Sequence, residues 1–136
     1  MTPILRIEAL AGAIAKMHAF HSPLSEAYFL RNPLMLRAFS PKHEKNEAGY
    51  RVFSSLSSGW DNGILDLKIK CSGNSHARLK PDDTLTNLVL CYGYPKTAAT
   101  GIKKFLRHAL ADENIMETQP LSWFMEDQKT AVAAGE

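Results

Sequence analysis

Apolar residues recur at helical intervals in several stretches of this 136-residue sequence. In the first stretch, over residues 3–20, they are three or four positions apart: Ile7, Leu10, Ala11, Ile14 and Met17. This spacing places them on one face of an α-helix, where they can cover a core, whereas a half-buried strand would alternate. Thr2 and Pro3 suit the cap and the first turn of such a helix. The sequence therefore predicts a mainly α fold.

The same criterion predicts three more helices. They run from Ser55 or Ser57 to Lys70, from Asp83 or Thr84 to Tyr92, and from Thr97 to Ala111. Serine and threonine at these starts can cap free amide groups, and two of the helices are followed by glycine, at Gly73 and Gly93. A short apolar segment at 121–125 is predicted to pack back on the core.

The remaining stretches predict little regular structure. Residues 21–31 are predicted to be a loop, and residues 40–49 a polar loop. Asn32 followed by Pro33 indicates a cap and a first turn, so we expect a short helical segment over 34–39. Residues 50–53 alternate, which predicts an edge strand or an extended run. At most one small β-hairpin is therefore expected.

One domain is expected over residues 1–125, with a flexible tail at 126–136. A chain of this length buries roughly two thirds of its unfolded surface, which is enough for a core without a metal or a disulfide. The predicted core comprises the inward members of the helices: Ile7, Leu10, Ile14, Trp60, Ile64, Leu88, Phe105 and Leu106. Cys71 and Cys91 are predicted to be two buried thiols rather than a disulfide.

Composition places the chain among ordinary folded proteins. It has 45% apolar and 22% charged residues and a net charge of +2, which by itself indicates no partner. No apolar run approaches the roughly 18 residues of a membrane span. Glu8 and Lys16 interrupt the N-terminal stretch, so it lacks the layout of a signal peptide. We therefore expect a cytoplasmic protein that does not associate with a membrane.

Few side chains have the spacing that a metal or cofactor site requires. The histidines are His18, His21, His43, His76 and His108. His18 and His21 are three residues apart, but zinc needs three or four ligands and the other candidates lack a zinc-finger spacing. There is no glycine-rich phosphate loop and no nucleophile elbow, and the serines around residue 55 suit helix caps. We expect no metal and no cofactor.

The last predicted helix has a basic outward face that carries Lys103, Lys104, Arg107 and His108. Such a face can contact phosphates, but a solvated basic face is the more common arrangement. A small helical regulator that binds nucleic acid or protein is therefore an alternative that we do not favour. Binding to phosphates would weaken steeply as the salt concentration rises.

The order of several sequence anchors resembles that of the lysozyme-like proteins of phages and prophages, which include virion structural lysins. The first anchors are Met17-His18-Ala19-Phe20, Pro23, Arg31-Asn32-Pro33 and Leu36-Arg37. In that family a helix ends in Glu-Gly-Phe, and a segment Asn-Asn-Asn-Pro-Gly-Asn-Leu-Arg follows at the same separation. Further anchors keep the family's order: Phe53, Ser54, Gly59, Leu79, Thr84, Leu85 and Tyr92. The resemblance covers roughly residues 7–110.

The resemblance implies a lysozyme-like helical domain with a cleft for a glycan of the peptidoglycan type. In the family, a glutamic acid protonates the glycosidic oxygen, and an apolar pocket raises the pKa of that acid. Here His18 stands at the position of the glutamate, and Ala19 replaces the glycine. Glu26 is the alternative acid if a loop carries it into the cleft. The implied cleft residues are His18, Phe20, Arg31, Asn32, Pro33 and Arg37.

These departures lead us to expect a relative without catalytic activity. Histidine cannot supply the carboxylate geometry on which ordinary glycosidases are built. Leu34 and Met35 stand where the family has glycine and a polar residue, and they would fill a groove with apolar side chains. The favoured function is a glycan-binding or protein-interaction module. The alternative is a peptidoglycan hydrolase or lytic transglycosylase that uses Glu26.

Overall fold

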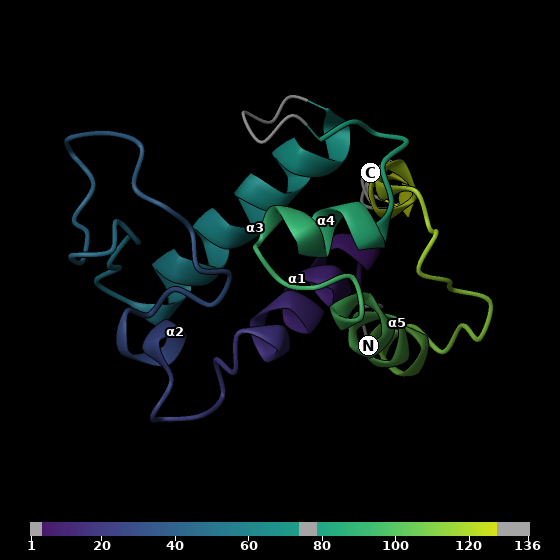
Figure 1. Cartoon of the computed structure of the whole chain (residues 1–136), viewed down its shortest axis with the longest axis horizontal. Helices are drawn as coiled ribbons and strands as arrows, with labels where there is room; N and C mark the ends of the chain where they lie inside the picture. The colour runs from purple at the N-terminus through teal and green to yellow at the C-terminus, as the bar shows by residue number, and fades with distance from the viewer. Residues whose placement is uncertain (1–3, 74–78, 128–136) are drawn as a thin grey trace, which may run out of the picture.

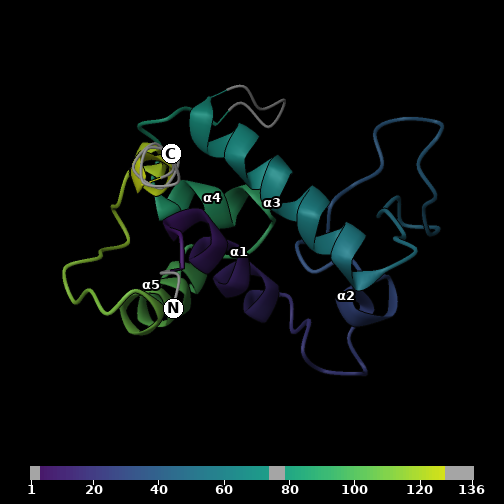
Figure 2. The same cartoon turned by 180° about the vertical axis from the view of Figure 1, so that it is seen from behind.

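The computed structural model describes residues 4–73 and 79–127, and this part of the chain is mainly helical and contains no β-sheet. Its elements are α1 (Arg6–Met17), α2 (Glu26–Phe29), α3 (Leu56–Ser72), α4 (Leu85–Cys91), α5 (Ala98–Ala109) and the 3₁₀-helix η1 (Leu121–Met125). Helix α1 is central, because it packs against α3, α5 and η1. Figures 1 and 2 show the short α2 beside the start of α3, away from α4 and α5.

Helix α1 confirms the predicted apolar face but is shorter than predicted. The Glu8 carboxylate accepts a hydrogen bond from the Leu5 N–H at 2.9 Å and so satisfies one free amide at the start. The helix ends at Met17 rather than Phe20, because Ala19 adopts a left-handed conformation with φ of 56°. The Phe20 N–H then bonds back to the Ala15 carbonyl at 3.0 Å, which closes the helix end. Thr2 and Pro3 lie outside the described residues.

The three other predicted helices are confirmed to within a few residues. Ser55 caps α3 by accepting from the Ser58 N–H at 3.1 Å. Gly73 follows α3 with φ of +85°, a conformation that glycine adopts without strain. Thr84 caps α4 through the Asn87 N–H. Serine and threonine before an apolar repeat therefore marked the starts of α3 and α4 correctly.

Two local predictions are wrong, and both concern residues 21–39. Residues 26–29 form helix α2, not a loop, because the Ser25 hydroxyl accepts from the Tyr28 N–H at 3.1 Å. Asn32 and Pro33 do not begin a helix. The Asn32 side chain is fully buried and accepts from the Leu36 N–H at 2.8 Å, so its amide organises a turn instead.

The segment after this turn is held by isolated backbone bridges. Arg37 pairs with Tyr50, and Lys45 pairs with Arg51, both antiparallel. No strand forms in residues 4–73 or 79–127, so the expected limit of one small hairpin is met. Residues 40–49 are the polar loop that was predicted.

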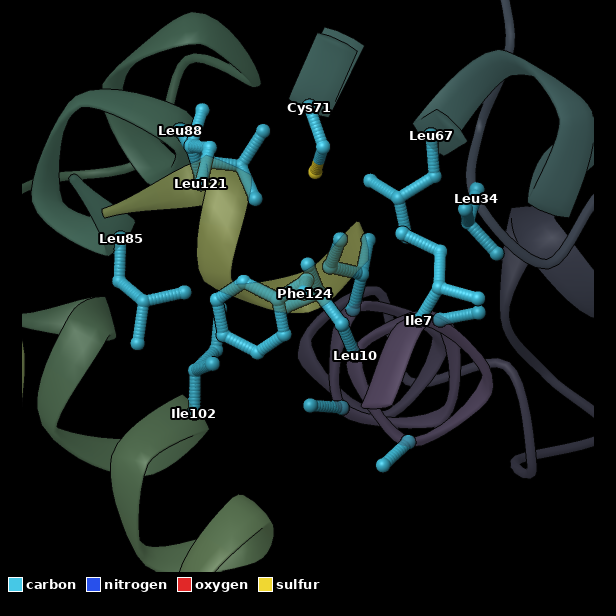
Figure 3. Packing of buried hydrophobic residues seen from close by; sticks show 14 of the residues in the cluster. Ile7, Leu10, Leu34, Leu67, Cys71, Leu85, Leu88, Ile102, Leu121 and Phe124 are labelled. Carbon is cyan, nitrogen blue, oxygen red and sulfur yellow. The ribbon is translucent and has the colours of Figure 1, made fainter. Parts of the chain in front are cut away.

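The core is built around α1 and η1. Ile7, Leu10 and Ile14 of α1 are fully buried, as are Leu88 and Leu106. Figure 3 shows the ring of Phe124 in the middle of this cluster, near Leu10, Leu85 and Ile102. The prediction that 121–125 packs on the core is therefore confirmed. Trp60, Ile64 and Phe105 were also predicted in the core, but they are only partly buried at its margin.

Two further details concern the C-terminal end and the cysteines. Glu126 and Asp127, the first residues of the predicted tail, contact the start of α1: the Arg6 N–H donates to Asp127 at 2.8 Å and the Arg6 guanidinium pairs with Glu126. The rest of the predicted tail, residues 128–136, lies outside the described residues. Both cysteines are free thiols, as predicted, but only Cys71 is buried and Cys91 is exposed.

Candidate functional site

His18 lies at the C-terminal end of α1 among aromatic side chains that come from beyond α4. Its Nδ1 atom is 2.9 Å from the Tyr94 hydroxyl. Its ring meets the rings of Tyr92 and Tyr94 edge to face, each at a centroid distance of 5.3 Å. Its Nε2 atom is buried and has no hydrogen-bond partner among the described residues. The imidazole is therefore held by packing and by one hydrogen bond.

A buried cation, Lys70, lies next to the aromatic side chains that contact His18. Lys70 of α3 is only 9% exposed and forms an ion pair with Asp66, four residues earlier on the same helix. Its ammonium also donates to the Tyr92 hydroxyl at 3.3 Å. Burial alone would lower the pKa of Lys70, but Tyr92 and Asp66 outweigh it and the pKa is raised. Lys70 is therefore charged at neutral pH.

Burial and the neighbouring Lys70 together set the protonation state of His18. Burial, and then the positive charge of Lys70, lower the pKa of His18 from 6.5 to about 4. Burial also raises the pKa of Tyr92 to about 12. At neutral pH His18 is therefore a neutral imidazole and the two tyrosines are neutral phenols. The charge of Lys70 is compensated by Asp66. A general acid needs a pKa near the working pH, so His18 is poorly suited to donate a proton.

Three of the implied cleft residues are structural. Phe20 is buried, and its ring meets Trp60 at a centroid distance of 5.4 Å. The Asn32 amide donates to the carbonyls of Leu36 and Arg51, both at 3.0 Å. Pro33 is buried against the start of α3. Their polar and apolar groups are engaged inside the protein, so they are not displayed to a ligand.

The other two implied cleft residues are exposed arginines. Arg31 donates to the Ser54 carbonyl at 3.0 Å. Arg37 lies over the Tyr50 ring, 4.4 Å from its centroid, and donates to the Ala48 carbonyl. No contact joins either arginine to His18 among the hydrogen bonds and ring contacts of the described residues.

The alternative acid, Glu26, is exposed at the start of α2. Its Oε1 atom accepts from the Asn46 amide at 2.7 Å. Its neighbours are therefore those of the 40–49 loop, whereas His18 faces Tyr94. Leu34 and Met35 were expected to fill a groove, but Leu34 is fully buried and Met35 packs against a small cluster with Phe20.

An apolar groove lies beside α2, and sequence reasoning missed it. We call this the α2 groove; it has a volume of about 400 Å³ and is lined by Pro23, Tyr28, Phe29, Arg31 and Leu56. The ring of Phe29 is 83% exposed, and Leu24, which follows Pro23 in the chain, is 96% exposed. The groove was missed because residues 21–31 were predicted to be a loop. Ser25 ahead of the short apolar run was the signal for the helix that forms it.

The basic face of α5 is partly occupied by contacts within the chain. Lys103 pairs with Glu117 at 2.8 Å, and the Arg107 guanidinium donates to the Ile115 carbonyl at 2.8 Å. Lys104 and His108 are exposed. Two of the four basic side chains are therefore committed, which weakens the case for a phosphate-binding stripe.

Residues 4–73 and 79–127 contain no group of three or more His, Cys, Asp and Glu side chains that could hold a metal ion. His76, one of the histidines considered from the sequence, lies outside these residues. None of the described helices has the length and apolar character needed to cross a membrane. Comparison of the chain with models of protein families, with curated proteins and with solved structures gives no match.

Proposed function

We propose that the chain is a lysozyme-like domain that has lost hydrolytic chemistry and acts as a protein-interaction module through the α2 groove. The family assignment, the loss of activity and the choice of partner class rest on different observations.

The backbone supports the family assignment most strongly. Ala19, Arg31 and Met35 have φ of 56°, 54° and 50°, in the left-handed region that favours glycine and tolerates asparagine. In the family motifs, aligned through the Phe20 and Pro33 positions, these three residues correspond to glycine, asparagine and asparagine. A left-handed conformation costs other residues roughly 1–2 kcal/mol. A backbone inherited from ancestors with glycine and asparagine accounts for that cost at these three positions; Ala111, outside the resemblance, is also left-handed, with φ of 50°.

The environment of residue 18 supports the loss of activity. The family acid needs an environment that raises its pKa, so that it holds a proton at neutral pH. Here burial, the larger influence on residue 18, would raise the pKa of a carboxyl group, whereas the ammonium of Lys70 would lower it. What is lost is the carboxylic acid itself, because His18 has a lowered pKa, is neutral at neutral pH and carries no acidic proton to donate.

The chemistry of the exposed surface favours a protein over a glycan. A sugar is bound by several polar groups that are placed around it, but the Asn32 amide is consumed by backbone groups. The α2 groove offers mainly apolar surface, from Phe29 and Leu56, with one cation. Sizeable exposed apolar patches rimmed by polar residues mark sites for proteins, membranes or small ligands, and an apolar surface suits a protein segment better than a polar glycan.

Cell-wall clearing tests the loss of activity. A suspension of purified peptidoglycan should keep its turbidity with the native chain, with His18→Glu and with Glu26→Gln. Clearing by the native chain that disappears in Glu26→Gln would make Glu26 the acid and refute the proposal. Clearing by His18→Glu alone would show that the cleft remains competent and that Lys70 does not prevent protonation.

A displayed library of random peptides tests the binding role. Peptides selected on the native chain should lose binding to Phe29→Ser and keep binding to Phe39→Ser. Phe39 is a matched control, because it is 82% exposed but lies outside the groove. A selection that yields no binder, or binders indifferent to Phe29→Ser, would refute an interaction role for the groove.

A further inference from the structure

The α2 groove combines an apolar floor with a single cation. Of its five lining residues, only Arg31 carries a charge. Its Nη1 atom donates to the Ser54 carbonyl, which uses one of the five N–H donors of a guanidinium. The ion pairs between described residues are Arg6–Glu126, Lys70–Asp66 and Lys103–Glu117, so no carboxylate in this part of the chain pairs with Arg31. The groove thus presents uncompensated positive charge beside apolar rings.

The position of Arg31 is maintained despite a conformational cost. Arg31 follows α2 in the left-handed conformation, where helices usually have glycine. Its N–H bonds to the Tyr28 carbonyl at 3.1 Å, and the Asn32 N–H bonds to the Ala27 carbonyl at 3.0 Å. These two hydrogen bonds fix the backbone at Arg31, and the Arg31 side chain lines the groove.

The size of the exposed patch distinguishes between occupants. A fully exposed aromatic side chain presents about 150–250 Å² and a leucine less, so the exposed parts of Tyr28, Phe29 and Leu56 together present on the order of 300 Å². A stable interface between two folded proteins needs about 800 Å² from each partner. The patch is therefore too small for a second copy of this chain but large enough for a peptide with one or two anchoring side chains.

We infer that the α2 groove binds a short segment of a partner protein in which an apolar side chain is followed within a few residues by a carboxylate. The apolar side chain enters the groove between Phe29 and Leu56, and the carboxylate pairs with Arg31. This inference rests on the proposed protein-interaction role and adds the chemistry of the partner. An arginine fork binds a carboxylate through two parallel hydrogen bonds, which gives the segment a direction as well as affinity.

Peptides from the displayed library test the inference through both members of the pair. The enriched sequences should share an aromatic or aliphatic residue followed by Asp or Glu. Replacing that acid by its amide should weaken binding to the native chain about tenfold, and should change nothing when the chain carries Arg31→Gln. Arg31→Lys should give an intermediate loss, because it keeps the charge without the fork. Lys104→Gln, which removes one positive charge from α5, is the matched control and should bind like the native chain.

The outcomes separate this inference from the proposed function. Binders that need Phe29 but have no acid, or whose affinity is equal for acid and amide, would overturn the carboxylate and leave the interaction role standing. Displacement of the peptide by an oligomer of N-acetylglucosamine would show that the groove is a glycan site and overturn the inference. Self-association that Phe29→Ser abolishes would show that a second copy occupies the groove. The substitution on the peptide requires no change in the protein, so a variant that fails to fold cannot obscure the result.

Discussion

The closest approach between α3 and the turn at residues 31–34 depends on two glycines. A Cβ atom added to Gly59 would lie 2.0 Å from the Arg31 carbonyl oxygen and 3.1 Å from the Pro33 ring. A Cβ atom at Gly63, one turn later, would lie 3.2 Å from a methyl group of Leu34. In contrast, a Cβ atom at Gly101 in α5 has no other atom within 4 Å. An added Cβ atom therefore meets backbone at Gly59, a movable side chain at Gly63 and open space at Gly101.

Alanine at these three positions should change stability in a fixed order. In a helix, Ala is favoured over Gly by about 0.5–1 kcal/mol, and this gain is common to all three variants. Gly101→Ala should realise it in full. Gly63→Ala should be close to neutral, because the Leu34 methyl group needs to move by only a few tenths of an ångström. Gly59→Ala must displace the Arg31 backbone by about 1 Å or more, so we expect a net loss of about 2 kcal/mol or more.

Equilibrium unfolding in urea measures this order directly, provided that the slope with urea is the same for all variants. If Gly59→Ala costs less than about 0.5 kcal/mol, the turn does not rest on α3 and the position of the groove is wrong. A destabilised Gly101→Ala would show that the helix propensity term was misjudged. Loss of the helical circular dichroism signal in Gly59→Ala would support the contact, because Gly101→Ala controls for the substitution itself.

Three further predictions concern single side chains. Because folding lowers the pKa of His18 from 6.5 to about 4, the stabilisation from its neutral form is fully present above pH 6.5. The free energy of unfolding, measured in urea, should fall by up to about 3 kcal/mol as the pH drops toward 4, and His18→Gln should flatten that dependence. Ala19→Gly should raise stability by about 0.5–1 kcal/mol in thermal melts, since it relieves a left-handed alanine, and a lower melting temperature would contradict the observed φ. Asn32→Ala should lower the free energy of unfolding in urea by about 2–4 kcal/mol, because it leaves buried backbone groups without their partners. Asn46 makes similar hydrogen bonds near the surface, so Asn46→Ala should cost under about 1 kcal/mol, and equal costs would show that burial is not the cause.

Local signals accounted for most of the helical framework. The apolar faces of α1 and α5 follow from a spacing of three and four residues, and the starts of α3 and α4 follow from Ser55 and Thr84. These features are readable because a helix forms hydrogen bonds between residues close in sequence, and its caps use side chains of adjacent residues. The burial of Leu88 and Leu106 follows for the same reason, since each lies on the apolar stripe of its own helix.

Contacts between distant segments decided the rest. The local sequence predicts a helix cap at Asn32. In the structure its amide also donates to the Arg51 carbonyl, nineteen residues later, and Asn32 becomes the centre of a buried turn. The middle of the core is occupied by Phe124, from the far end of the chain. Trp60 lies at the margin of the core and is only partly buried. His18 is neutral because it is buried against Tyr92 and Tyr94 and because Lys70 adds a positive charge. Such positions depend on which surfaces meet when the helices pack, and packing energy depends on shape and burial that no single stretch of sequence contains.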